Sequence, residues 1–207
     1  MPRVLVAVPT FDGSIKAQTF ESAANLDWGD CDVQYRTVSG YDCAAARNNI
    51  VDEVLRRGFD YCLMVDSDVV LPQDALTNLM EWREPLVLGY YAHQGSFAPP
   101  LGAGKTCLCK PSSYHEQFTG EEMASFREVG KYKVEVRGGG MGCALISREA
   151  VTRTSFPWFK FVVYEDRHGV LSEDLYFCKK LRDAGVQPYA DARVACGHYF
   201  RHVEQMP

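Results

Sequence analysis

The feature that most constrains the fold is a short apolar run that ends in two aspartates. Residues Tyr61–Val65 are apolar without strict alternation, which is typical of a strand buried on both faces of a sheet, and Asp66-Ser67-Asp68 follows immediately. Two carboxylates at the end of a buried strand repel one another unless a positive charge lies between them, and a divalent cation is the usual source of that charge. In open α/β sheets this edge is also where ligands bind. An isolated Asp-x-Asp is more often a solvated turn, so the interpretation depends on the rest of the chain.

Strand-like and helix-like segments alternate through the first half of the sequence. The predicted strands are Arg3–Val8, Cys31–Val38, Tyr61–Val65 and Leu86–Tyr91, and the predicted helices are Ser14–Asn25, Ala44–Arg57 and Pro72 to about Trp82. Ser14 is the expected N-cap of the first helix, and Gly58 ends the second. The alternation predicts an α/β fold with a mainly parallel central sheet and helices on both faces. The length of 207 residues predicts one domain that spans 1–207.

The periodic pattern is lost after Leu86–Tyr91. Residues 92–120 are rich in Gly, Pro and Ser, so a long loop or excursion is predicted at about 92–130, suited to a mobile cover over a site. Further elements are predicted beyond it: strands at Lys131–Arg137, Cys143–Ile146, Val186–Tyr189 and Arg193–Cys196, a helix or turn at Ser147–Thr152, and a helix at Ser172–Ala184.

Composition narrows the classes of partner and compartment. The formal net charge of -5 predicts no general attraction to nucleic acid or anionic lipid, and no apolar run approaches the length of a membrane span. The eight cysteines are scattered, and four of them, Cys31, Cys62, Cys143 and Cys196, lie in apolar, strand-like stretches. This favours reduced thiols in the core of a cytoplasmic protein, although an even count also allows disulfides. Cys107, Cys109 and His115 are a weak zinc candidate, because their spacing matches no common zinc site and no fourth ligand is evident.

Two acidic residues and a histidine near the end of the chain carry further chemistry. Glu173 and Asp174 follow Ser172 at a predicted helix start, where acids commonly complement the helix dipole but also suit a general base that the dipole keeps ionised. His198 lies in a short polar tail, either as a surface residue or as a neutral imidazole that completes a metal site, with His202 as the competitor.

A basic motif opens the second predicted helix. Arg47 and Asn48 either face water there or contact a phosphate or nucleotide, because Arg suits planar anionic groups and helix starts favour anions.

Taken together and in this order, the motifs resemble those of a compact GT-A glycosyltransferase, of the kind grouped with family 2 and with small bacterial and phage enzymes. The matching segments are Val6–Thr10, Ala46-Arg47-Asn48, Met64–Asp68, Gly139–Ile146, Ser172–Leu175 and the late His198. The resemblance covers nearly the whole chain and implies a single Rossmann-like GT-A domain. The chain departs from the family in its small size and in the Cys- and Pro-rich 92–120 segment.

The resemblance implies an activity and a set of site residues. The activity is metal-dependent transfer of a sugar from a nucleotide-diphosphate sugar, a UDP- or GDP-sugar, to an acceptor hydroxyl. Asp66, Asp68 and His198 would hold Mn²⁺ or Mg²⁺, and Asp174 or Glu173 would act as the base. The nucleotide-sugar pocket would be formed by Pro9, Thr10, Arg47, Asn48, Asp66 and Gly140. The acceptor stays open among a glycan, a small molecule, a protein and a modified nucleic-acid base, as do the sugar and the stereochemical course.

Three other functions compete with this interpretation. A haloacid-dehalogenase-like phosphatase also uses a strand that ends in Asp-x-Asp, with Asp66 as nucleophile and Asp68 as acid/base, but that family usually begins with this strand. A nucleotidyltransferase is expected to have a Gly-rich basic loop after its first strand, and this chain has Pro9-Thr10-Phe11-Asp12 there instead. A non-catalytic nucleotide-sugar binding module needs no base, so Glu173-Asp174 argues against it.

Overall fold

A seven-stranded mixed sheet forms the centre of the molecule. The structure is a computed structural model and describes residues 1–93, 102–164 and 169–199. The sheet order is β2 (Asp32–Ser39), β1 (Arg3–Thr10), β3 (Tyr61–Val65), β10 (Cys143–Ser147), β5 (Leu86–Tyr90), β13 (Tyr189–Ala195) and β8 (Lys133–Glu135). Five strands share one direction, and only β10 and β8 run against it. The prediction of a mainly parallel sheet is confirmed, since most strands share one direction, but the two antiparallel strands make the sheet a mixed one.

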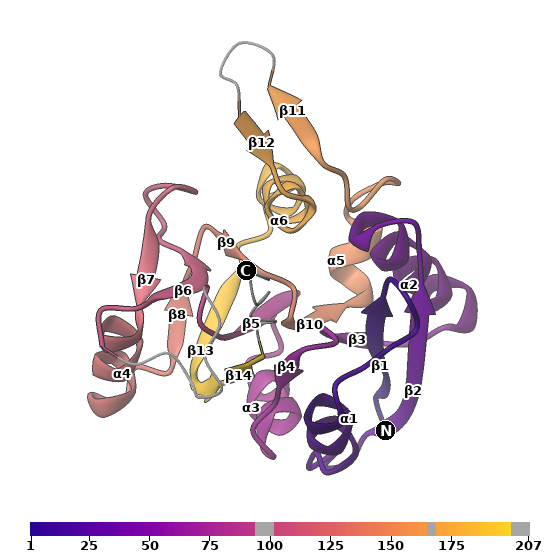
Figure 1. Cartoon of the computed structure of the whole chain (residues 1–207), viewed down its shortest axis with the longest axis horizontal. Helices are drawn as coiled ribbons and strands as arrows, with labels where there is room; N and C mark the ends of the chain where they lie inside the picture. Colours follow the sequence, from indigo (N-terminus) through magenta and orange to yellow (C-terminus); the bar gives the residue numbers. More distant parts are fainter. Residues whose placement is uncertain (94–101, 165–168, 200–207) are drawn as a thin grey trace, which may run out of the picture.

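Helices lie on both sides of this sheet, as expected from the alternating pattern (Figure 1). α2 (Cys43–Arg57), α5 (Arg148–Thr152) and α6 (Glu173–Asp183) lie on one side, and α1 (Ala17–Ala24) and α3 (Ala75–Glu81) lie on the other. α2 begins and ends at residues that stabilise helix ends, which is why it could be predicted from the sequence. The Asp42 side chain accepts from the Ala45 N–H at its start, and Gly58 ends it at a positive φ of 71°. Its buried stripe of Ile50, Val51 and Val54 faces the core.

Several predicted boundaries were wrong for local reasons. Ser14 does not cap α1, because its hydroxyl donates to Asp12 and the helix begins after Lys16. α3 begins at Ala75 rather than Pro72, since β4 (Val69–Val70) and a turn come first. The two strands predicted near residue 190 are one strand, β13. The polar Asp191 interrupts the apolar pattern in the sequence, but it lies fully buried and accepts from Trp82 and Arg193.

The excursion predicted at about 92–130 contains regular structure in its described part. β6 (Lys105–Cys109), β7 (Gln117–Thr119) and β9 (Gly138–Gly139) form a three-stranded sheet. α4 (Gly120–Glu128) follows, with a capping box between Thr119 and Glu122. Together with β8 these elements form one end of the molecule (Figure 1). The side chains of residues 107–109 are buried. The prediction of an irregular segment is therefore wrong for residues 102–130, its role as a mobile cover stays a prediction, and residues 94–101 lie outside the described residues.

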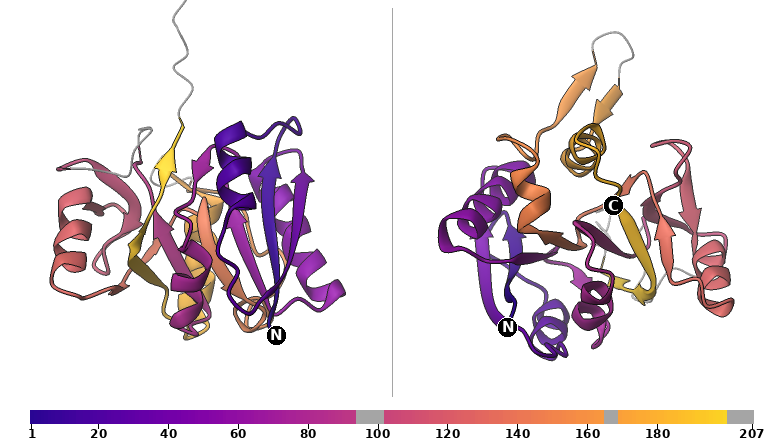
Figure 2. Two further views of the ribbon diagram at one scale, coloured as in Figure 1. Left: turned by 90° about the horizontal axis from the view of Figure 1, so that it is seen from below. Right: turned by 180° about the vertical axis from the view of Figure 1, so that it is seen from behind.

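Two small pairs of strands complete the fold. β11 (Val162–Tyr164) and β12 (Gly169–Leu171) form a hairpin that projects beyond the body of the molecule just before α6 (Figure 2). β14 (Gly197–His198) pairs with β4 and brings His198 beside the Asp66–Asp68 turn. In the part of the chain that the structure describes, none of the helices has the length and apolar character that a membrane span requires.

Candidate functional site

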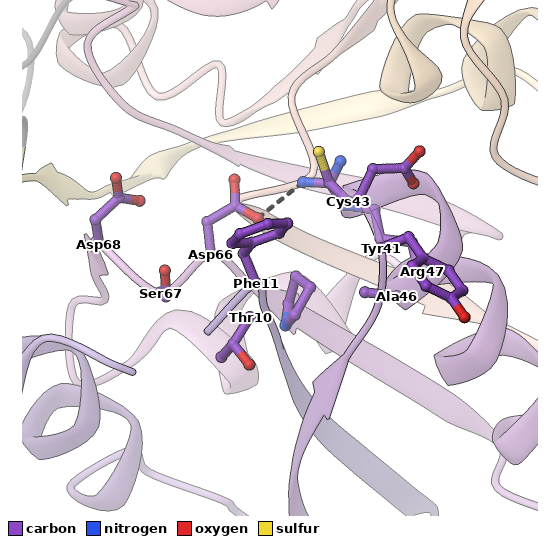
Figure 3. Close-up of a pocket in the computed structure, with 11 residues that line it drawn as sticks. Thr10, Phe11, Tyr41, Cys43, Ala46, Arg47, Asp66, Ser67 and Asp68 are labelled. Atoms are coloured by element: carbon purple, nitrogen blue, oxygen red, sulfur yellow. Dashed lines mark hydrogen bonds and ion pairs between the residues drawn. The ribbon is translucent and has the colours of Figure 1, made fainter. Parts of the chain in front are cut away.

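The carboxyl ends of β1 and β3 and the start of α2 surround a cavity of about 350 Å³ (Figure 3). Parallel strands end at one edge of a sheet, so the residues that follow them are brought together there. The cavity is lined by Pro9, Thr10, Phe11, Tyr41, Asp42, Cys43, Ala46, Arg47, Asp66, Ser67 and Asp68. Five of the predicted site residues are in this lining. A second hollow of about 560 Å³ lies on the side of Asp68 that faces Lys16 and Tyr199.

Asp68 and His198 lie next to one another although they are far apart in the sequence. The pairing of β14 with β4 puts His198 opposite Val69, and His198 Nε2 lies 3.6 Å from Oδ1 of Asp68. Burial lowers the pKa of His198, but the Asp68 carboxylate and the Ala92 carbonyl outweigh it, so the pKa is raised above its usual value.

Asp68 and His198 are placed to bind a divalent cation together, whereas the Asp66 carboxylate is not directed toward them. A carboxylate oxygen and an imidazole nitrogen are suitable ligands for Mn²⁺, and here they are adjacent. Among the described residues, however, no group of three or more His, Cys, Asp or Glu side chains is arranged to hold a metal ion. This also leaves Cys107, Cys109 and His115 without a zinc site. The Asp66 carboxylate points toward Arg47 (Figure 3).

Arg47 lies at the centre of three carboxylates. Its side chain is only 4% exposed, and Nη2 donates to Oδ1 of Asp66 at 2.8 Å. Nη1 donates to Glu173 and Asp174, which come from the first turn of α6. The Nε atom has no partner among the described residues. Arg47 therefore neither faces water nor presents a free guanidinium to the cavity, which were the two interpretations of the sequence.

The acids around Arg47 do not behave as isolated helix-start carboxylates. Burial raises the pKa of Asp174 to about 7; the Arg47 guanidinium opposes this shift, and the charges of Glu173 and Asp66 add to it. The predicted helix-dipole effect on Asp174 took no account of burial, which raises the pKa of this carboxyl group. A carboxyl group with such a pKa can accept a proton near neutral pH.

Asn48 is used by the protein backbone rather than by the cavity. Its Oδ1 atom accepts from the N–H groups of Trp158 and Phe159 at 3.0 and 3.1 Å, and its Nδ2 donates to the Phe159 carbonyl at 2.8 Å. The side chain ties α2 to the aromatic segment before β11, and it is not in the cavity lining.

Gly140 is required by a neighbouring tyrosine. A Cβ atom at Gly140 would lie 2.1 Å from the Tyr91 hydroxyl oxygen, and one at Gly142 would lie 2.9 Å from Oδ2 of Asp66. The Gly142 N–H donates to the Tyr91 hydroxyl at 3.1 Å. The glycine run therefore lies beside Asp66, as expected, but Gly140 itself packs on Tyr91 and does not line the cavity.

Two aromatic residues at the cavity were missed. Phe11 and Tyr41 line it and are 80% and 95% exposed. Each follows the end of a strand at the ligand-binding edge, so the rule that located Asp66 also applies to them. Exposed aromatic rings beside a cavity can stack on a planar ligand.

Comparison with known proteins defines the fold. No family model matches the chain, and no curated protein sequence matches it. Among solved structures, the crystal structure of A197 from STIV superposes with a TM-score of 0.64 at 19% identity, covering 97% of this chain and 86% of that chain. The chain is similar in fold to A197. At this identity the likeness to A197 extends to the fold alone, because one fold can carry many functions.

Proposed function

We propose that the protein is a GT-A-type glycosyltransferase that moves a sugar from a nucleotide-diphosphate sugar to an acceptor hydroxyl. The observation that carries the proposal is the convergence of Asp66, Glu173 and Asp174 on Arg47 beside the cavity. Candidate donor-binding and proton-accepting groups therefore lie together at the ligand-binding edge of the sheet. The volume of about 350 Å³ is within the range of small-ligand pockets.

The residues of the site take different parts in this proposal. Phe11 and Tyr41 would contact the base of a UDP- or GDP-sugar, with Pro9 and Thr10 beside them. Asp68 and His198 would hold Mn²⁺ or Mg²⁺, whose chemistry when bound is to neutralise charge on the departing diphosphate. Asp174 would take the proton from the acceptor hydroxyl if the reaction inverts, and its raised pKa supports that part. Glu173 is the alternative base.

The acceptor and the compartment belong to the same proposal. The acceptor is a glycan, a small molecule, a protein or a modified nucleic-acid base. All eight cysteines are free, which supports a reducing compartment and hence the cytoplasm.

Calorimetry with UDP and GDP tests the donor site. Nucleotide should bind far more tightly with Mn²⁺ than with a chelator, and Asp68→Asn should remove that difference. Phe11→Ala and Tyr41→Ala should weaken nucleotide binding about tenfold, on the scale of a lost aromatic stack. Asp32→Asn, an exposed acid at the start of β2, is the matched charge control. Equal affinity with and without metal would reject the metal-dependent donor site.

Turnover separates the enzyme from its competitors. Asp174→Asn should lower donor hydrolysis or transfer by about 10²-fold or more while nucleotide affinity stays within about threefold. Phosphate release from simple phosphoesters, abolished by Asp66→Asn, would favour the phosphatase. Nucleotide binding without any turnover of UDP- or GDP-sugars would favour the binding module.

A further inference from the structure

The guanidinium of Arg47 joins two segments that are distant in the sequence. One side bonds to Asp66 at the end of β3, and the other bonds to Glu173 and Asp174 at the start of α6. Arg stays protonated in proteins, so the buried group carries one fixed positive charge against three carboxyl groups. Removing that charge would leave one buried carboxylate, Glu173, and two partly buried ones, Asp66 and Asp174, without their cationic partner, which is costly.

The two aspartates of the Asp66–Asp68 turn have different partners. Asp66 Oδ1 lies 2.8 Å from Arg47 Nη2, whereas Asp68 Oδ1 lies 3.6 Å from His198 Nε2. Figure 3 shows the two carboxylates on either side of Ser67, with Asp66 directed toward Arg47. Backbone hydrogen bonds hold the two aspartates apart. The Tyr199 N–H donates to the Asp68 carbonyl, and the Asp66 N–H donates to the Gly142 carbonyl.

We propose that Arg47 is a positioning residue that holds Asp66 together with Glu173 and Asp174, and that Asp66 serves this cluster rather than a cation. A divalent cation is then left to Asp68 and His198. The second statement rests on the proposed function, because it needs a cation at Asp68. The first does not, since the ion pairs are present in the protein alone.

Manganese affinity distinguishes the two aspartates without any measurement of turnover. Electron paramagnetic resonance of free Mn²⁺ at pH 7.5 should show at least a tenfold loss of affinity for Asp68→Asn. Asp66→Asn should stay within about threefold of the parent. Arg47→Met should bind Mn²⁺ about tenfold more tightly, because a nearby positive charge is removed and Asp66 becomes available. That gain should disappear in the Arg47→Met/Asp66→Asn double variant.

Lys16→Met is the matched control for charge, since Lys16 lines the hollow beside Asp68 but does not pair with Asp66. Its effect on Mn²⁺ affinity should be within about threefold, since a solvent-exposed charge is screened. If Asp66→Asn weakens Mn²⁺ as much as Asp68→Asn does, Asp66 is a metal ligand and the proposal is overturned.

Thermal unfolding tests the ion-pair role of Arg47 independently of metal. Arg47→Met should lower the melting temperature by about 5 °C or more, as expected for breaking a buried ion pair. Arg47→Lys should restore part of this loss, because it keeps the charge but not the planar fork. Asp66→Asn should raise the melting temperature in the Arg47→Met background, where it removes an unpaired carboxylate, and should not do so in the parent.

The two sets of measurements separate the failures. If the parent binds no Mn²⁺, the metal-dependent function fails, and the melting temperatures alone decide the role of Arg47. If Arg47→Met does not fold, Arg47→Gln, which also removes the charge but keeps hydrogen-bond donors, takes its place in the same comparison. Equal shifts for Asp66→Asn in both backgrounds would overturn the positioning role.

Discussion

Nδ1 of His198 lies 2.9 Å from the carbonyl oxygen of Ala92, while Nε2 of the same ring faces Asp68. A carbonyl can only accept, so Nδ1 carries the hydrogen and donates it. In the neutral ring the lone pair is then on Nε2, on the side of the Asp68 carboxylate. A backbone carbonyl that orients a histidine in this way is common behind metal-binding imidazoles.

Replacing His198 should therefore weaken metal and nucleotide together. We expect His198→Ala to lower Mn²⁺ affinity by about tenfold or more and to be partly rescued by raising Mn²⁺, because Asp68 remains. Titration by calorimetry checks this, with the exposed His115→Ala as control. A variant that binds Mn²⁺ and nucleotide like the parent would exclude His198, and His202, which is outside the described residues, would become the candidate.

Asp174 should make stability fall as the pH rises. Its pKa is raised from 3.8 to about 7 by burial in the folded protein, so between these values the folded state keeps a proton that the unfolded state has lost. The contribution of Asp174 to the free energy of unfolding therefore decreases from about pH 4 to about pH 7 and is constant above.

Asp174→Asn removes this dependence. Melting curves should show the variant gaining on the parent as the pH rises through that window, by an amount on the order of 2 kcal/mol or more. Asp183→Asn removes a carboxylate at the exposed end of α6 and should show no such gain. A constant difference between Asp174→Asn and the parent across the window would contradict the raised pKa.

Asn48 should matter for stability and not directly for the ligand. Asn48→Ala removes three hydrogen bonds to the backbone of Trp158 and Phe159, so the free energy of unfolding should fall by about 2–3 kcal/mol. Denaturant unfolding and nucleotide titration should be measured on the same preparation, with Asn25→Ala as an exposed control. A loss of nucleotide affinity with unchanged stability would restore the nucleotide contact expected from the sequence.

Gly140 should tolerate a methyl group only if Tyr91 gives way. Gly140→Ala brings Cβ to 2.1 Å from the Tyr91 hydroxyl, so we expect a loss of about 1–3 kcal/mol. Tyr91→Phe removes that oxygen and should recover part of the loss in the double variant, although alone it costs the bond from Gly142. Additive effects of the two changes would show that the contact is not what requires glycine.

Local sequence patterns were sufficient to predict most strands and helices of the central sheet and its covering layers. The apolar run at Tyr61–Val65 and the capped helix before Gly58 are read from neighbouring residues, and both lie where the sequence puts them. β6 was missed because its five residues lie in a Gly- and Pro-rich stretch and pair with β7 and β9 instead of repeating a local period. Pairing partners of this kind are a tertiary property.

The candidate site was predictable only as a set of residue types at one edge of the sheet. The rule for strand ends located Asp66 and Asp68, and the predicted helix start at Ser172 pointed to Glu173 and Asp174. The ion pairs of Arg47 depend on α6 being folded against the end of β3. Because this contact is tertiary, the residues near Arg47 in the sequence do not determine whether its guanidinium faces water, phosphate or carboxylate.

The position of β10 has a consequence for how this molecule can change. β10 pairs with β5 in antiparallel register, with Ala144 opposite Leu88. The chain therefore leaves the sheet at the end of β5 and returns at the start of β10, and these two points are neighbours. A segment whose ends are neighbours can be lengthened, shortened or exchanged at small entropic cost. Such an exchange would leave β1, β3 and the turn after β3 in place and would remove from the central sheet only β8, the edge beside β13. Evolution or engineering can therefore replace much of the segment between β5 and β10 while the cavity is kept, provided that the Ala92 carbonyl behind His198 and the Gly142 carbonyl that accepts from Asp66 are retained and that the new segment again covers the β13 edge.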